Sequence, residues 1–146
     1  MTGERGAIGG VEVLPFGLLV FVVGALLLAN AWAVVDAKLG VDTAAREAGR
    51  AYVEAPGGPA AAARAADQAG RDAIRGVGRD PDRLSVGRRG GGDVRCSIIE
   101  TTATYVVPAV RLPFVGGFGH GFTVRGRHRD VVDPFTADRT GDAACG

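Results

Sequence analysis

The longest apolar stretch of the chain runs from Val13 to Val35 and reads VLPFGLLVFVVGALLLANAWAVV. Among its 23 residues only Asn30 has a strongly polar side chain, and none is charged. As a helix it would be about 34 Å long at about 1.5 Å per residue, and the hydrocarbon core of a bilayer is about 30 Å thick. Buried helices of soluble domains are usually shorter and polar on one side. The pattern therefore predicts a transmembrane helix over residues 13–35, in contact with the lipid bilayer.

The same stretch also has features of a secretory signal peptide. Residues 1–12 are short, glycine-rich and mildly charged, and Ala29-Asn30-Ala31 offers an A-x-A cleavage pattern after an apolar region. Against cleavage, the apolar character continues to Val35 and the acidic residue Glu12 precedes the run. An uncleaved anchor is the favoured interpretation. The alternative is a secreted soluble binding module that signal peptidase releases after Ala31.

After Asp36 the chain keeps a helical period but becomes amphipathic. Small apolar residues recur at helical spacing up to Ala55, and the sequence Pro-Gly-Gly at 56–58 ends the pattern. We expect one long helix over residues 14–54 and a second over residues 59–75. The stripe of small residues on the second helix consists of Ala62, Ala66, Ala69, Ala73 and Val77. Opposite charges four residues apart predict three ion pairs: Asp42–Arg46, Arg50–Glu54 and Asp67–Arg71.

From residue 84 the apolar period changes from 3.6 to 2, which indicates β-strands. The first predicted elements are a strand from 84, a turn over 88–93, and a strand to 107 with a bulge or bend at 98–99. A Gly/Phe loop over 114–122, a strand over 122–132 and a loose tail from 134 to 145 follow. The predicted fold class is α+β, in which a long N-terminal transmembrane helix continues into a stalk and packs on a small antiparallel sheet. The predicted regions are 1–12 (leader or N-terminal tail), 13–35 (transmembrane helix), 36–78 (helical stalk and second helix) and 79–146 (small antiparallel β region).

The chain has two cysteines, Cys96 and Cys145, and both follow the apolar run. An even number of cysteines on one side of a membrane segment suggests a disulfide in an oxidising compartment, although two free thiols are the alternative. Closing this loop of about 50 residues would stabilise the fold by about 4 kcal/mol in the chain-entropy model.

Composition and motifs give little support for an enzyme. The net charge is +1, so no overall field favours nucleic acid or an acidic substrate. The glycine-rich segment 116–121 lacks the Lys and Ser/Thr of a phosphate-binding loop, and no Ser or Cys lies in a nucleophile motif such as G-x-S-x-G. The separations between Cys96, His120, His128 and Cys145 fit no compact zinc pattern. We therefore expect no catalytic activity, no cofactor and no metal.

Arginines gather in the predicted sheet and in its first turn. Such residues can bind phosphate groups or DNA. No aromatic stacking surface is interleaved with them, and Asp130 and Asp133 lie beside them in the sequence. A solvated sheet face, or a polar contact with another subunit, is therefore favoured over nucleic acid. The arginines are Arg88, Arg89, Arg125, Arg127 and Arg129.

Residues 4–52 read ERGAIGGVEVLPFGLLVFVVGALLLANAWAVVDAKLGVDTAAREAGRAY. The Arg-Gly-Ala at 5–7 followed by an acidic residue, the apolar helix and the Ala/Arg stalk resemble the N-terminal region of TadE-like proteins. These are minor pilins or pseudopilins of tight-adherence (Tad/Flp) pilus systems. The segments YVVP at 105–108 and VRGRH at 124–128 resemble the C-terminal strands of actinobacterial members. Together the two resemblances cover most of the chain and imply a pilin-like fold.

The resemblance implies a membrane-held precursor that a prepilin peptidase cleaves after a glycine, with a glutamate at the fifth mature position. Cleavage after Gly6 would make Glu12 the sixth residue, and a leader that ends at Ala7 would make it the fifth. Gly9 and Gly10 are further candidate cleavage points. In a bundle of such helices, the new α-ammonium group would pair with the Glu12 carboxylate of a neighbour at low dielectric. Gly17 and Gly24 are seven residues apart and share a helix face, which allows close helix packing.

The two arguments about orientation point in opposite directions. More Lys and Arg residues follow the apolar run than precede it, so the positive-inside rule alone would place the C-terminal side in the cytoplasm. The cysteines and the resemblance place it outside, and we follow them. The expected protein is a single-pass protein of the cell membrane with an extracellular C-terminal domain. Its expected role is structural, in assembly of a Tad-type pilus or related secretion apparatus. The implied partners are other pilins or pseudopilins, Tad assembly proteins and the prepilin peptidase.

Overall fold

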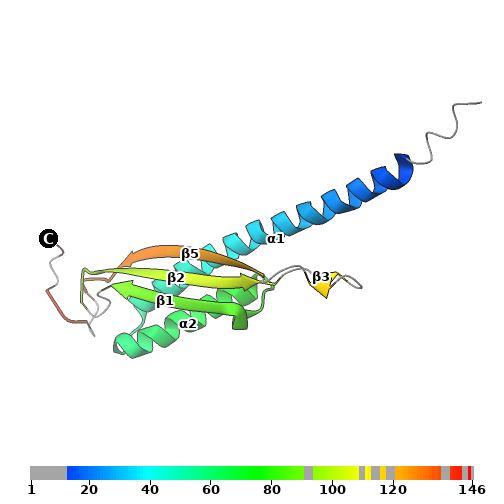
Figure 1. Cartoon of the computed structure of the whole chain (residues 1–146). Helices are drawn as coiled ribbons and strands as arrows, with labels where there is room; N and C mark the ends of the chain where they lie inside the picture. The colour runs from blue at the N-terminus through cyan, green and yellow to red at the C-terminus, as the bar shows by residue number, and fades with distance from the viewer. Residues whose placement is uncertain are drawn as a thin grey trace, which may run out of the picture. The chain divides into compact units, whose positions relative to one another are not determined.

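The computed structural model describes residues 13–90, 94–108, 111–112, 116–117, 121–135, 139–142 and 145. The chain divides into two compact units, Met1–Ala33 and Val34–Gly146. The elements are α1 (Val13–Glu54), α2 (Gly58–Gly76), the 3-10 helix η1 (Pro81–Arg83), β1 (Leu84–Gly90), β2 (Ile98–Val107), β3 (Arg111–Leu112), β4 (Gly116–Gly117) and β5 (Phe122–Val131) (Figure 1). This is the predicted α+β layout, with a long N-terminal helix that begins apolar and a small antiparallel sheet.

The part of α1 in the first unit carries large apolar side chains around its circumference. Val13, Leu14 and Leu19, which lie on three different sides of the helix, are 66%, 75% and 60% exposed. The Asn30 amide donates from Nδ2 to the carbonyl oxygen of Leu26 at 3.2 Å, so this polar side chain has a partner within the helix. The helix is long and apolar enough to cross a membrane, and its most apolar window is not buried. The predicted transmembrane helix is therefore present as a candidate span.

The part of α1 in the second unit is amphipathic, and its buried face is built from small residues. A large side chain on this face would hold the helix away from the sheet, whereas alanine and glycine let the two backbones approach. The buried residues recur at helical spacing: Ala37, Gly40, Val41, Ala44, Ala45, Ala48, Gly49 and Tyr52. This periodicity is the one that predicted the stalk, and α1 ends at Glu54 as expected.

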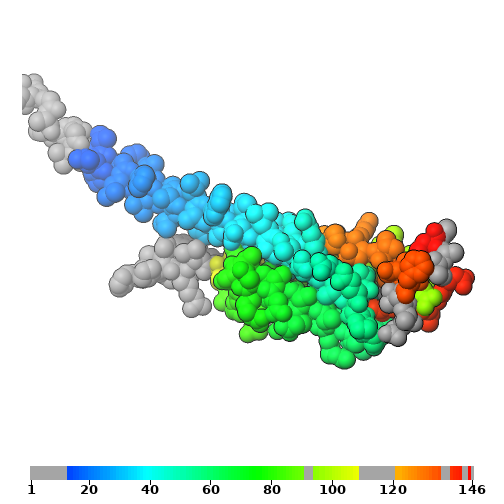
Figure 2. Space-filling view, turned by 180° about the vertical axis from the view of Figure 1, so that it is seen from behind, coloured from blue at the N-terminus to red at the C-terminus, as the bar shows by residue number. Residues whose placement is uncertain are grey.

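Helix α2 extends the predicted second helix by one residue at each end. Pro59 lies in its first turn, and Gly57 before it has φ 88°, a conformation that glycine adopts without strain. Its buried residues are Ala62, Ala66, Gly70 and Ile74, so only two of the five predicted stripe residues, Ala62 and Ala66, are buried. Burial of Ile74 removes more apolar surface from water than burial of Ala69 or Ala73 would, so the helix turns the face that contains Ile74 toward the core. Figure 2 shows α2 (green) beside the cyan part of α1.

The sheet has the strand order β1-β2-β5, with antiparallel pairing throughout. The register places Leu84 opposite Tyr105, and Tyr105 opposite Val124. One sheet face packs on α1 and α2, and the other faces solvent (Figure 1). The main core cluster joins α1, Ile74 of α2 and the inner sheet face. Its members are Ala37, Val41, Ala44, Ala45, Ile74, Leu84, Ala103, Tyr105, Val107 and Val124.

Two connections differ from the predictions. Strand β1 continues to Gly90, so Arg88 and Arg89 lie in the strand and not in a turn. The predicted bulge at 98–99 does not form: Ile98 and Ile99 are the first two residues of β2 and pair in continuous register with Val131 and Asp130. The chain turns before the strand, where Cys96 has φ 62°. Within the predicted Gly/Phe loop, Gly116–Gly117 pairs with Arg111–Leu112, and residues 113–115 and 118–120 lie outside the described residues.

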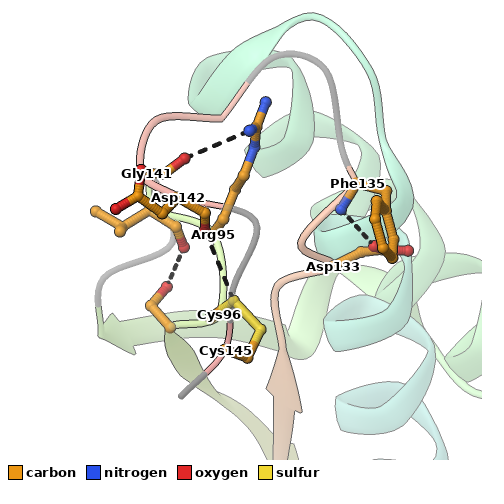
Figure 3. Close-up of a disulfide and its surroundings, with 9 residues drawn as sticks. Arg95, Cys96, Asp133, Phe135, Gly141, Asp142 and Cys145 are labelled. Atoms are coloured by element: carbon orange, nitrogen blue, oxygen red, sulfur yellow. Dashed lines mark hydrogen bonds between the residues drawn. A yellow bond between two sulfur atoms is a disulfide. The ribbon is translucent and has the colours of Figure 1, made fainter.

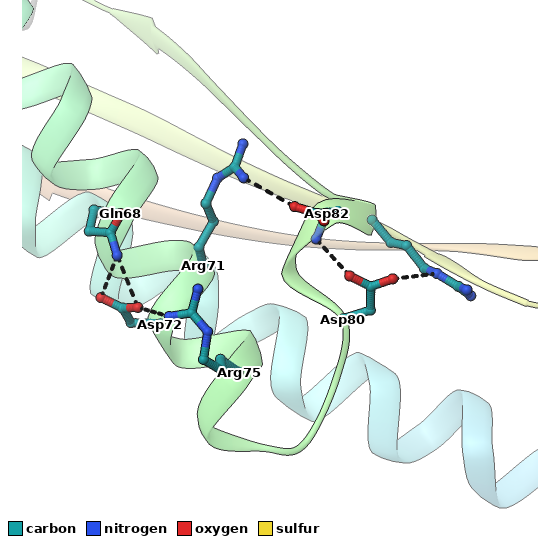
Figure 4. A network of polar contacts seen from close by, with 7 residues as sticks. Gln68, Arg71, Asp72, Arg75, Asp80 and Asp82 are labelled. Atoms are coloured by element: carbon teal, nitrogen blue, oxygen red, sulfur yellow. Dashed lines mark hydrogen bonds and ion pairs between the residues drawn. The ribbon is translucent and has the colours of Figure 1, made fainter.

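Only one of the three predicted helix ion pairs forms. Arg50 and Glu54 pair at 3.2 Å, but Asp42 pairs with Lys38 at 2.5 Å. Asp67 and Arg71 do not pair with each other. Asp67 pairs with Arg88 of β1 at 2.7 Å, and Arg71 pairs with Asp82 of η1 at 3.5 Å. Figure 4 shows that Arg71 reaches from α2 to the segment that holds Asp80 and Asp82. The Asp72 carboxylate accepts a hydrogen bond from Gln68 and pairs with Arg75. These partners connect α2 to the sheet and to η1.

Candidate functional site

The predicted processing and assembly residues Gly6, Ala7 and Glu12 lie outside the described residues. The first candidate region that the structure describes is the apolar surface of α1. A Cβ atom added at Gly17 or Gly24 would meet nothing within 4 Å. Both glycines therefore leave small gaps in the side-chain surface of an apolar helix. Such a surface can contact lipid or allow a second helix to pack closely.

Asp36 and Lys38 are the first charged residues after the apolar run, and both contact other elements of the second unit. Asp36 pairs with Arg79 at 2.6 Å. Lys38 donates to the carbonyl oxygen of Arg125 in β5 at 2.7 Å, and its other contact is the Asp42 carboxylate. These groups attach the beginning of the stalk to the sheet and to the end of α2.

Close backbone approach between α1 and β5 depends on Gly126. A Cβ atom there would lie 2.6 Å from Asp42 Oδ1, 2.8 Å from the Val41 carbonyl oxygen and 2.9 Å from Asp42 Cα. Two of these three atoms are backbone, so a side chain could not be accommodated without moving the helix or the strand. Sequence reasoning missed this residue, although an isolated glycine inside a strand pattern is a known sign of close approach.

A polar cluster lies where α1 meets the other end of β5. A Cβ atom at Gly49 would collide with Asp130 Oδ2 and would lie 3.4 Å from Thr101 Oγ1. His128 Nε2 is 3.3 Å from Asp130 Oδ1. In the part of the chain that the structure describes, Asp130 Oδ2 and Thr101 Oγ1 are buried without a hydrogen-bond partner. A helix glycine is therefore required to leave space for a carboxylate.

The disulfide closes the far end of the sheet. Cys96 and Cys145 are bonded, with Cα atoms 5.2 Å apart, as the sequence predicts (Figure 3). The amide of Cys96 donates to the carbonyl oxygen of Val132 at 3.0 Å, and Arg95 donates through its backbone amide to Thr140 at 2.8 Å. The bond therefore joins the turn before β2 to the tail after β5, and each segment also has backbone hydrogen bonds.

The prediction of a loose tail was wrong for Arg139, which is only 4% exposed. Its Nη2 donates to the carbonyl oxygen of Tyr52 at 3.1 Å, and its guanidinium lies 5.1 Å from the centroid of the Tyr52 ring. Tyr52 is in the last turn of α1, where carbonyl groups lack helical partners and a cation is favourable. α1 has no basic residue in its own last turn, so a residue 87 positions later supplies the charge.

The arginines of β5 lie on the outer face of the sheet, as predicted. Arg125, Arg127 and Arg129 are exposed, and Arg129 Nε is 2.8 Å from Glu100 Oε2. The hydrogen bond from Arg129 holds the pKa of the Glu100 carboxyl below its usual value, and the charges of Arg127 and Arg89 act in the same direction. This face is therefore positively charged around its one acidic side chain.

Among the described residues, no group of three or more His, Cys, Asp or Glu side chains is arranged to hold a metal ion. Comparisons with protein-family models, curated proteins and solved structures found no match.

Proposed function

We propose that this protein is a membrane-anchored structural subunit, a TadE-like pseudopilin that acts in assembly of a Tad-type pilus or related secretion apparatus. One observation carries the proposal: a single 42-residue helix, α1, combines an exposed apolar segment with a buried stalk segment. An extracellular assembly subunit needs both a membrane anchor and a folded domain.

The exposed apolar segment supports the anchor. Burying a side chain such as Leu or Phe is worth about 1.5–3 kcal/mol, so a helix that leaves many of them in water is strongly unfavourable. Leu18, Leu19 and Phe21 alone are 65%, 60% and 72% exposed. A bilayer removes this cost, and afterwards a neighbouring helix can pack against the notches at Gly17 and Gly24.

The disulfide supports the proposed orientation. Disulfides persist in oxidising compartments and are rare in the cytosol. Cys96 and Cys145 belong to the second unit, so this unit lies outside the cell in our proposal. The prepilin peptidase would act on the other side of the membrane, at Gly6 or Ala7.

Glu12 is the assembly residue in this proposal. A carboxylate at the membrane edge has no favourable partner in an isolated helix, and the α-ammonium group of a neighbouring processed subunit would be one. The test is to replace Glu12 by Ala or by Gln and to measure recovery of partner subunits after mild cross-linking in native membranes. We expect both variants to enter the membrane normally and to recover at least about fivefold less partner, because about 1 kcal/mol of pairing energy corresponds to that factor. Unchanged recovery with both variants would contradict an assembly role for Glu12.

One observation favours a second candidate function, a secreted binding module. The boundary between the two compact units falls between Ala33 and Val34, two residues after the Ala29-Asn30-Ala31 pattern. Cleavage after Ala31 would therefore leave every buried core residue in the released chain. A mature protein that begins at Trp32 would establish this candidate in place of the first.

A further inference from the structure

The outer face of the sheet has a groove of about 400 Å³ that no part of the proposed function uses. Gly87 of β1 is opposite Thr102 of β2, and Thr102 is opposite Arg127 of β5. A Cβ atom at Gly87 would have only the Thr102 carbonyl oxygen nearby, at 4.0 Å, so the missing side chain leaves open space. Arg89 of β1 lines the groove from one edge strand, and Arg125 and Arg127 line it from the other.

These three arginines differ from most arginines in the described part of the chain. Within that part, the guanidinium groups of Arg89, Arg125 and Arg127 have neither a hydrogen bond nor an ion pair. Seven others are paired with carboxylates: Arg50, Arg71, Arg75, Arg79, Arg83, Arg88 and Arg129. These three unpaired cations therefore lie around one groove.

The groove contains one acidic side chain, and that side chain is already engaged. Glu100 accepts from Arg129 at 2.8 Å. The lowered pKa of Glu100, caused first by this hydrogen bond and then by the charges of Arg129, Arg127 and Arg89, is an independent sign of positive potential. An anion entering over Thr102 and Thr104 would meet three guanidinium groups that make no hydrogen bond to Glu100 and that act on this carboxylate through charge alone.

We propose that this groove binds phosphate groups. A phosphate has tetrahedrally arranged oxygens that can accept from donors on opposite sides, and arginine presents a planar fork of N–H groups that matches them. The donors here come from both edge strands, and the hydroxyl groups of Thr102 and Thr104 lie between them. A carboxylate has two oxygens in one plane, which suits one guanidinium better than three.

The composition of the groove separates this proposal from single-stranded nucleic acid binding. Bases are usually held by aromatic stacking, and no aromatic residue lines this groove. The recognised feature is therefore the phosphate itself, presented either by a soluble polymer or by a lipid headgroup. The inference does not depend on the proposed pilus function, because it uses only residues of the outer sheet face.

The test uses the full chain in nanodiscs of zwitterionic phosphatidylcholine, and the probe is inorganic polyphosphate. The variant is Arg89→Gln with Arg125→Gln and Arg127→Gln. The matched control is Arg46→Gln with Arg50→Gln and Arg64→Gln, which removes three exposed charges from the helices. We expect the groove variant to bind about eightfold more weakly, because each of the three exposed guanidinium groups contributes roughly twofold, and we expect the control to bind within about twofold of the original chain.

Two results would overturn the proposal. In the first, the groove variant and the control lose the same affinity, which would mean that general charge attracts the probe. In the second, poly-L-glutamate of equal charge binds as tightly as polyphosphate, which would mean that the groove does not select phosphate. Competition by phosphatidylglycerol vesicles then identifies the source: displacement of polyphosphate indicates a lipid headgroup, and no displacement indicates a soluble phosphate polymer.

Discussion

The two segments of α1 share one continuous helical backbone and differ in the size and exposure of their side chains. Up to Ala33 the helix carries Leu, Val and Phe in every direction, and these side chains are exposed. From Val34 onward its inner face is mostly alanine and glycine, and this face is buried. Lipid chains adapt to any large apolar surface, whereas a sheet accepts a helix only at a fixed distance. Side-chain size therefore indicates which kind of neighbour each segment has.

The largest expected effect comes from charging the apolar segment. Leu19→Arg with Val23→Arg should abolish membrane retention, because each arginine at the centre of a membrane helix costs about 2.5–3.5 kcal/mol. The matched control is Leu39→Arg with Thr43→Arg, which has the same spacing on an exposed face of the second segment. Carbonate extraction of membranes measures retention. Equal loss in the two double variants would mean that the segments do not differ as described.

Removing the disulfide should destabilise the second unit alone. Cys96→Ser with Cys145→Ser is expected to lower its free energy of unfolding by about 4 kcal/mol, because a loop of 49 residues is no longer closed in the unfolded chain. Thermal unfolding followed by the fluorescence of Tyr52 and Tyr105 reports on this unit. Helicity of the apolar segment in nanodiscs should not change. If alkylation without reductant modifies both cysteines in the original chain, the disulfide itself is disproved.

A methyl group at the closest backbone contact should have a smaller effect. Gly126→Ala is expected to cost about 1–3 kcal/mol, because the Val41 carbonyl and Asp42 Cα of the stalk must move. Gly87→Ala is the control, since it is also a strand glycine but has open space at its Cβ position. Urea unfolding of both variants gives the difference. Equal midpoints would show that the stalk does not need to lie so close to β5.

The smallest expected effect depends on pH. The folded-state pKa of Glu100 is below its ordinary value of 4.5, so this carboxylate contributes stability above pH 4.5 and loses it as the pH falls below that value. In Glu100→Gln this part of the acid dependence should disappear. The control Glu47→Gln, which changes an exposed glutamate of α1, should retain the acid dependence of stability that Glu100 causes. Identical acid-unfolding curves for the original chain and Glu100→Gln would contradict the Arg129 pairing.

Local signals predicted most of the fold, because they depend on neighbours in the sequence. The Pro-Gly-Gly at 56–58 ends α1 where expected, and the alternation from Ile99 to Val107 matches the buried face of β2. Long-range partners were not predictable in the same way. Asp67 was assigned to Arg71 on its own helix, but it pairs with Arg88, because the strand register brings a better placed guanidinium beside α2.

The candidate sites show the same limit. The disulfide was predicted because both cysteines lie on the same side of the apolar run. Arg139 was missed, since nothing in the local sequence indicates that it binds the Tyr52 carbonyl 87 residues earlier. The groove was missed because Arg89 and Arg127 line it from two different edge strands. Their proximity depends on the strand order of the sheet and not on the local sequence. Sequence reasoning placed Arg89 in a turn, and that error hid the relationship.

The most direct test of the central proposal is the intact mass and N-terminal sequence of the protein isolated from native membranes. We expect an N-terminus between Ala7 and Val11, with α1 retained and Glu12 close to the new α-ammonium group. A mature chain that begins at Trp32 would contradict it, because the apolar segment would then be a signal peptide and the second unit a released domain.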